Sequence, residues 1–398
     1  MSTAIPIIIF ILILGIVVFI HELGHYLMAR RAGVYVEEFA LGMGPKLFGF
    51  KGKPMKVKEK DSPKEKTVSW TSTPLDESES EPEEEPEPEP KRTLYSLRLF
   101  PIGGFCRMHG ADENIPGDPT ALNNKSIPQR ALVMAGGSIF NFVMAFALFF
   151  LLVLLDGYSV PQVHSIIPDT PAYHAGLIEG DRITHLDGRR VAIFEDFVTQ
   201  LEFSGGQPVD VRFVRSGESH NVTITPMRVR DNWQLGFFMV RYLGVLEPIV
   251  HESQQRVGPW GTFTTSAEMI LFNLRMPFTL LARLISGDNV PEGAGVMGPI
   301  GMGGEVIAIY QHVVERGFLP TLLTMLFFTA LLNAALGIMN LLPIPALDGA
   351  KLIFLGIEGI RKKPVSPERE GLVHLVGFVA LMLLAVFIAY RDIARLLG

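Results

Sequence analysis

The chain has 398 residues, of which 48% are hydrophobic, and carries a net charge of −6. This length suits two or three domains, and the apolar share together with a positive mean hydropathy indicates a membrane protein rather than a soluble one. A single cysteine, Cys106, excludes an intramolecular disulfide. The mild acidic balance predicts no nucleic-acid partner.

Four runs that are almost free of charge are long enough to cross a bilayer, because a spanning helix needs about 20 apolar residues. They cover residues 4–28, 131–155, 319–342 and 372–390. No basic residue precedes the first run, so we expect it to be retained rather than cleaved as a signal peptide. Basic residues follow the first and third runs, which places both following loops in the cytoplasm and the amino terminus outside.

Residues 34–130 are predicted to form a membrane-associated β-hairpin that is interrupted by an acidic insert at about 52–91. Within the insert, DESESEPEEEPEPEP has no base and no aromatic residue, and such a composition cannot bury enough apolar surface to become ordered. On either side, VEEFALGMGPKLFGF and TLYSLRLFPIGGFCRM are short, strand-like stretches punctuated by glycine.

Two further regions separate the second and third runs. Residues 159–229 combine β-type stretches with glycine turns, the pattern of a small mixed domain that can add a peptide strand to a groove. In residues 260–318, charged Glu268, Arg275 and Arg283 interrupt an apolar helical stretch. This pattern favours an amphipathic helix at the membrane interface over a fifth span.

The first run contains HELGH, residues 21–25, which places two histidines and a glutamate inside an apolar segment. Ionisable groups in a span cost a few kcal/mol each and so indicate function. The i, i+4 spacing puts His21 and His25 on one helix face, where they supply half of a tetrahedral zinc site. Zinc makes water acidic enough for Glu22 to take its proton and pass it to a leaving amine.

A third zinc ligand is expected on another apolar element, and Asp348 in NLLPIPALDG meets that requirement at the end of the third run. Pro343 and Pro345 break the helix there, and irregular backbone at membrane depth is tolerated only where it is buried in protein or lines a wet cavity. Asn340 could hydrogen-bond a substrate backbone or a developing oxyanion.

Together these motifs resemble the site-2 proteases, a family of intramembrane zinc metalloproteases, in the bacterial form with one PDZ-like domain. The resemblance covers nearly the whole chain and rests on HELGH, the two hairpin stretches, GGSIFN, GLIEGDRI, GPIGM and NLLPIPALDG. It implies Zn2+ held by His21, His25 and Asp348, with Glu22 as general base and Asn340 near the scissile carbonyl. Ala350 stands where the family usually has a second glycine, which leaves the ligand set unchanged.

The sequence therefore predicts an α-helical polytopic membrane protein with four transmembrane helices, a membrane-associated β-hairpin and an inserted α+β PDZ-like domain. The expected regions are 1–33 with HELGH, 34–130 for the hairpin, 131–156 for the second span, 159–229 for the PDZ-like domain, 260–318 for the interfacial helix and GPIGM, 319–360 for the third span with LDG, and 371–394 for the fourth. We expect a multi-pass protein of the cytoplasmic (inner) membrane with the PDZ-like domain outside.

The leading hypothesis for function is hydrolysis of peptide bonds within the spans of single-pass membrane proteins, such as anti-sigma factors or remnant signal peptides. The partners are then these substrates and membrane lipid. An edge strand of the hairpin could hold the substrate extended, with Tyr95 and Leu97 as candidate substrate-binding residues. Two alternatives stay open: a membrane-anchored metalloprotease that acts on soluble peptides, and a PDZ membrane scaffold with an inactive site.

Overall fold

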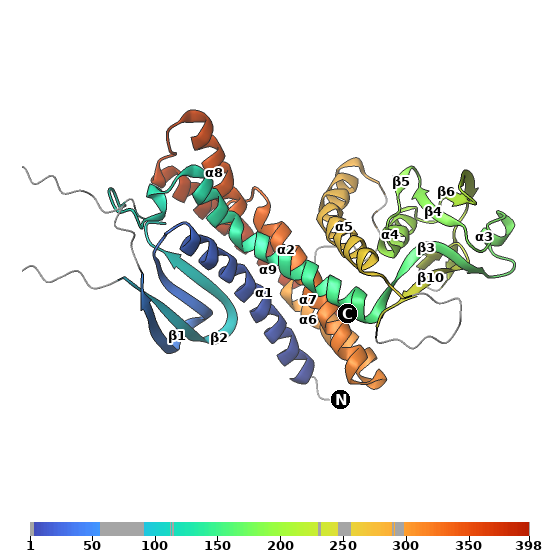
Figure 1. The fold of residues 1–398 in the computed structure, drawn as a ribbon, viewed down its shortest axis with the longest axis horizontal. Coiled ribbons are helices and arrows are strands. Elements are labelled where there is room, and N and C mark those ends of the chain that lie inside the picture. Colours follow the sequence, from blue (N-terminus) through green and yellow to red (C-terminus); the bar gives the residue numbers. More distant parts are fainter. Residues whose placement is uncertain are drawn as a thin grey trace, which may run out of the picture. The chain divides into compact units, whose positions relative to one another are not determined.

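The computed structural model describes residues 4–55, 91–111, 113, 115–229, 232–245, 256–288, 290 and 298–397. The acidic tract at 76–90 lies outside the described residues. The described chain divides into two compact units (Figure 1). The first comprises Met1–Phe10, Asn141–Met339 and Val379–Gly398, and the second comprises Ile11–Phe140 and Asn340–Phe378.

Within the described residues, five helices are long and apolar enough to cross a membrane: α1 (Ala4–Arg31), α2 (Ile127–Asp156), α5 (Pro259–Ser286), α7 (Phe318–Leu341) and α9 (Pro367–Leu397). Four of them match the expected spans, and the chain is a multi-pass membrane protein. Helix α5 has a mean hydropathy of 1.3, against 2.0 to 3.0 for the others. The structure therefore adds a fifth candidate, and the count of four spans stays a prediction.

The β-hairpin of the second unit consists of β1 (Val36–Pro54) and β2 (Arg92–Met108). Strand β1 bends, so that Leu97 of β2 pairs both with Leu41 and with Phe48. The first half of β2 therefore lies between two stretches of β1, whereas Gly104–Met108 pairs with β1 on one side. Tyr95 and Leu97 therefore lie inside this sheet, and Gly104–Met108 lies at its edge.

Charged side chains join the ends of the hairpin strands. Lys91 donates to Asp118 at 2.6 Å, and His109 lies between Glu37 (2.9 Å) and Asp118 (3.0 Å). Burial alone would raise the pKa of Asp118, but hydrogen bonds from Lys91 and Thr120 hold that pKa well below its usual range. The carboxylate thus stays ionised and ties the start of β2 to its end.

Helices α1 and α2 of the second unit cross in close contact at two glycines. A methyl group added at either Gly24 or Gly136 would collide with the backbone of the other residue. Close approach of small residues is a common way for helices to associate in membranes. Gly136 of GGSIF is therefore a packing element between α1 and α2.

In the first unit, a six-stranded sheet forms the PDZ-like domain. Its strands are β3 (Gly157–Ile166), β4 (Arg182–Leu186), β5 (Arg189–Arg190), β6 (Val209–Arg215), β7 (Glu218–Ile224) and β10 (Phe237–Leu243), in the order β10-β3-β4-β6-β7 with β5 paired to β4. Helices α3 (Pro171–His174) and α4 (Phe194–Phe203) and the pair β8 (Met227–Val229) and β9 (Asn232–Gln234) accompany it. Since β10 joins the sheet, the sheet continues beyond residue 229.

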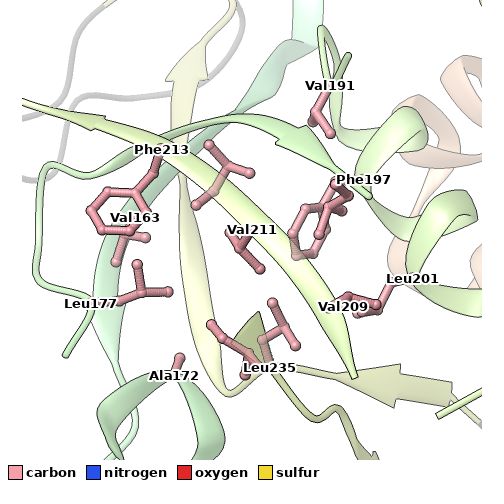
Figure 2. Packing of buried hydrophobic residues seen from close by; sticks show 13 residues of the cluster. Val163, Ala172, Leu177, Val191, Phe197, Leu201, Val209, Val211, Phe213 and Leu235 are labelled. Carbon is pink, nitrogen blue, oxygen red and sulfur yellow. The ribbon is translucent and has the colours of Figure 1, made fainter. Parts of the chain in front are cut away.

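Alternating residues of these strands build the core of the domain (Figure 2). Val209, Val211 and Phe213 of β6 point to one side and are almost fully buried, together with Val163, Phe197 and eight other apolar residues. Burying a side chain of this size contributes about 1.5–3 kcal/mol. The period of two in VDVRFVR is thus the direct cause of the packed face.

Helix α6 (Pro299–Val313) of the first unit begins within the GPIGM motif. Asp392 of α9 is buried, and its Oδ2 accepts hydrogen bonds from the backbone N–H groups of Gly298 (3.0 Å) and Gly301 (2.8 Å). A methyl group added at Gly301 would lie 3.0 Å from this carboxylate. The glycines of the motif therefore allow a side chain from another helix to cap α6.

We predict that α5 lies along the membrane interface, because its apolar residues are interrupted by charge and it is the least apolar candidate. Cysteines introduced at Gly258 and Asp288, each in a Cys106→Ser background, should react with a membrane-impermeant maleimide from the same side of intact vesicles. Labelling from opposite sides would make α5 a fifth span and reverse the predicted orientation of α7.

Candidate metal centre

Three ligand-type atoms converge in the second unit. The Nε2 atoms of His21 and His25 on α1 lie 3.1 Å apart, and each lies close to Oδ2 of Asp348, at 3.2 and 3.1 Å. Asp348 opens helix α8 (Asp348–Arg361). Both histidines are buried, at 7% and 6% exposure, in the second half of the apolar helix α1. The structure brings together the three residues that the sequence predicts as ligands.

The spacing of these atoms suits a zinc ion. Two ligand atoms that are each about 2.0–2.2 Å from a tetrahedral zinc lie roughly 3.3 Å apart, close to the observed separations. His25 Nδ1 donates to the carbonyl oxygen of Val133 at 2.8 Å, which leaves the Nε2 lone pair directed at the cluster. A carboxylate binds a metal in its ionised form, and Asp348 is the acidic group of this cluster.

Gly137 of α2 leaves the space that the imidazoles occupy. A methyl group at this position would lie 2.5 Å from Cε1 and 2.6 Å from Nε2 of His21, and 2.6 Å from Nε2 of His25. The collision would be with rings held inside a packed interior. The absence of a side chain at Gly137 is thus a condition for the observed geometry, and this role was not predicted from the sequence.

The turn between α7 and α8 presents Asp348. Ala346 has a left-handed conformation (φ 77°), and its N–H donates to Nδ1 of His374 on α9 at 2.9 Å. A methyl group at Gly349 would collide with the carbonyl groups of Leu341 and Leu342. The role of His374 was not predicted from the sequence. Its contact with the turn is long-range, and no local pattern indicates it.

An ion pair secures the far end of α8. Arg130 lies in the first turn of α2. Its Nη1 and Nη2 atoms donate to the carboxylate of Glu358, at 3.0 and 2.5 Å. Each side chain is 16% exposed. A bidentate pair of this kind fixes direction as well as distance. Helix α8 is therefore attached to the helix that also carries Gly137 and Val133.

Glu22 lies beside the cluster and is positioned by the hairpin. A methyl group added at Gly104 on β2 would lie 3.5 Å from the Cγ of Glu22. The aromatic ring of Phe39 on β1 contacts Phe19 of α1, with the ring centroids 5.8 Å apart. The hairpin thus covers α1 at the level of HELGH.

The other predicted site residues occupy different places. Asn340 lies in the last turn of α7 and is partly buried. The hydroxyl of Tyr95 contacts that of Tyr26 at 2.5 Å, and the Tyr95 ring stacks on Phe50. Leu97 is 45% exposed on the hairpin. Roles for these three residues in substrate binding stay predictions.

Comparison with known proteins places this site in a family. The model of Peptidase family M50 matches residues 9–57 and 88–384. The chain belongs to this family. Similar proteins include Zinc metalloprotease RasP of Shouchella clausii, 30% identical over 97% of this chain and 98% of that protein, and Regulator of sigma-W protease RasP of Bacillus subtilis, 29% identical over 97% and 98%. This M50 chain is thus a zinc metalloprotease of the site-2 protease family.

Zinc metalloprotease RasP of Oceanobacillus iheyensis is a further relative, 28% identical over 97% of this chain and 98% of its own length. Among solved structures, the PDZ domain of the SdrC-like protein of Listeria monocytogenes is similar over 21% of this chain and 90% of that domain. Its sequence identity is 22% and its TM-score 0.19.

We predict that Gly137→Ala abolishes zinc binding, because the added methyl group would force the His21 and His25 rings apart. The matched control is Gly356→Ala on α8, where a methyl group meets no atom within 4 Å. Elemental analysis of the purified proteins should find stoichiometric zinc in the wild type and the control and almost none in Gly137→Ala. Full zinc occupancy in Gly137→Ala would contradict the assigned geometry.

A second prediction concerns the ion pair of α8. Arg130→Met should lower the free energy of unfolding by ~2 kcal/mol and speed the loss of zinc to a chelator, because it leaves Glu358 without its partner. Arg130→Met combined with Glu358→Met should recover much of both losses. Thermal unfolding and chelator kinetics measure the two effects, and equal losses in the single and double variants would show that the pair does not position α8.

Proposed function

We propose that this metalloprotease hydrolyses peptide bonds within the transmembrane segments of single-pass membrane proteins. The observation that carries the proposal is the position of the cluster: His21, His25 and Glu22 lie in a helix whose other residues are suited to a bilayer, and Asp348 meets them there. A site for soluble peptides has no need to place three ionisable groups in an apolar span, where each is costly.

In this proposal His21, His25 and Asp348 hold zinc, which acts as a Lewis acid on water and on the scissile carbonyl. Glu22 takes a proton from the water as the water oxygen bonds to the carbonyl carbon. It then gives that proton to the amide nitrogen as the carbon–nitrogen bond breaks. The hairpin lies against the Glu22 side chain at Gly104 and so keeps it in place through both transfers. Asn340 is proposed to donate to the substrate backbone or to the developing oxyanion.

The substrate has to be extended for this reaction, because a helix shields its peptide bonds. The register of the hairpin supports strand addition at Gly104–Met108, the half of β2 that has β1 on one side and lies against Glu22 at Gly104. A peptide added at this edge would form backbone hydrogen bonds beside the general base. Tyr95 and Leu97 lie two strands inside this edge, so their proposed contacts are with a part of the substrate that crosses the face of the sheet.

The proposed substrates are membrane proteins such as anti-sigma factors or remnant signal peptides. The relative named Regulator of sigma-W protease RasP supports the first class. We place the protein in the cytoplasmic membrane with the PDZ-like domain outside, on the distribution of basic residues after the first and third expected spans.

The test uses purified protein reconstituted with a single-pass test substrate. Glu22→Gln should stop cleavage and keep stoichiometric zinc, because it removes the proton acceptor but no ligand, whereas Asp348→Ala should lose both. Glu305→Gln, which changes an exposed glutamate on α6, is the control and should leave cleavage unchanged. Full zinc occupancy and activity in Asp348→Ala would refute the ligand assignment.

The same assay distinguishes the alternatives. Equal cleavage of a substrate without an apolar span would favour a protease for soluble peptides. Stoichiometric zinc with no cleavage of any membrane substrate would favour a scaffold with an inactive site.

A further inference from the structure

Helix α1 presents two neighbouring faces at the level of HELGH. The two histidines of the cluster occupy one face. Phe19, Glu22 and Tyr26 follow one another at i, i+3 and i+7 and so share the other face. The hairpin lies beside α1 (Figure 1), and its Gly104 is close to Glu22. The residue proposed as general base therefore lies in the middle of the surface that the hairpin covers.

A hydrogen bond between two phenols joins this face of α1 to the hairpin. The hydroxyl oxygens of Tyr26 on α1 and Tyr95 on β2 lie 2.5 Å apart, so one hydroxyl donates to the other. The Tyr26 ring also contacts the ring of Phe39 on β1, with the centroids 5.2 Å apart. The guanidinium of Arg30 lies 5.9 Å from the Tyr26 centroid. Tyr26 is thus held where α1 meets both strands.

Both stretches of the bent strand β1 confine the Tyr95 ring. Tyr95 pairs with Phe39 in the first stretch and with Phe50 in the second. The Phe50 ring stacks on it with the centroids 5.2 Å apart, and the Phe39 centroid is 6.4 Å away. A methyl group added at Gly52 would lie 2.7 Å from Cε2 of Tyr95. A ring confined in this way keeps one rotamer, so its hydroxyl is a fixed point of the hairpin.

The row of paired residues that contains Tyr95 ends at the open edge of the sheet. Phe39 pairs with Tyr95 on one side and with Cys106 of the edge on the other. The hydrophobic effect is non-directional, so ring contacts alone would allow the hairpin to slide along α1. Two hydrogen-bonded hydroxyl oxygens have to lie about 2.5–3.0 Å apart. This requirement fixes the row, and with it the edge, at one height on the helix.

We propose that the hydrogen bond between Tyr26 and Tyr95 positions the hairpin so that its open edge, Gly104–Met108, lies beside Glu22. The inference rests on the proposed function, in which a substrate strand joins this edge. Tyr26 and Tyr95 are positioning residues, because they act through the placement of β2 and do not have to touch the reacting atoms. The substrate contact proposed above for Tyr95 is a separate role of its ring, since its hydroxyl is bonded to α1.

The test compares cleavage of a single-pass substrate in nanodiscs by the full-length zinc enzyme and by Tyr26→Phe, Tyr95→Phe and the double variant. Phenylalanine keeps each ring and removes its hydroxyl. A displaced edge misaligns the scissile bond, so each single variant should lower kcat by about ten-fold. The rest of the substrate still binds, so KM should stay within about two-fold of the wild type. The double variant should match the single ones, because the second hydroxyl has already lost its partner.

Tyr35→Phe is the matched control. The Tyr35 hydroxyl donates to the carbonyl oxygen of Arg92 on β2 and not to a residue of α1. This variant should keep the kcat and KM of the wild type. All the variants should keep stoichiometric zinc and the melting temperature of the wild type, so that a lower kcat reports the placement of the hairpin.

Three results would overturn the proposal. One is a wild-type kcat in either single variant. Another is a raised KM in Tyr95→Phe with no change in Tyr26→Phe, which would make the Tyr95 hydroxyl a substrate contact. The third is a pair of losses that multiply in the double variant, because the two hydroxyls would then act independently. Each of these results requires an active wild type, whereas a wild type that cleaves no membrane substrate would refute the proposed function and this inference with it.

A spectroscopic measurement without substrate detects the contact itself. The eight tyrosines are replaced by 3-fluorotyrosine, and the full-length protein is studied by fluorine NMR. Tyr26→Phe should remove one resonance and shift the resonance that Tyr95→Phe removes, and the converse should hold for Tyr95→Phe. Tyr35→Phe should leave both resonances in place. If neither resonance moves when its partner is replaced, the two phenols are not bonded and the proposal is wrong.

Discussion

The second unit depends on one contact, the approach of a carboxylate to two imidazoles inside an apolar helix. Without compensation, ionisable groups at this depth cost a few kcal/mol each. A metal ion held by these groups would offset that cost, but only if Asp348 reaches His21 and His25 from another element. Four features hold Asp348 close to the two histidines. They are the close helix crossing at Gly24, the space at Gly137, the contact of His374 with the turn before Asp348, and the ion pair at the end of α8.

Much of this site is predictable because its parts are local in sequence. The i, i+4 spacing fixes the two histidines relative to each other on any helix, and the prolines before Asp348 show where the spanning helix stops. The residues that hold α8 and the turn before it in place cannot be predicted in this way. Arg130 and Glu358 lie 228 positions apart, and neither stands out within its own helix. A single sequence contains no signal that joins them.

The fold shows the same difference between local features, which the sequence predicts, and long-range pairings, which it does not. Alternation in VDVRFVR predicts a strand and its buried face, and the structure has both. The sheet nevertheless recruits β10, which is separated from β7 by a further strand pair, so the expected domain end at residue 229 falls inside the sequence that builds the sheet. The bend of β1 was not predicted either. Glycines in a strand-like stretch indicate an irregular backbone, but they do not indicate which segments pair with each other.

That bend bears on how the chain assembles during synthesis. Both stretches of β1 leave the ribosome before β2, yet residues 94–97 of β2 pair between them. The two stretches must therefore stay separated until the middle strand arrives, and its insertion is a late, non-local step of the kind that slows folding. Because closure entropy grows only with the logarithm of loop length, the connection from Pro54 to Arg92 can change length through evolution at little thermodynamic cost, while the order of strand arrival stays fixed.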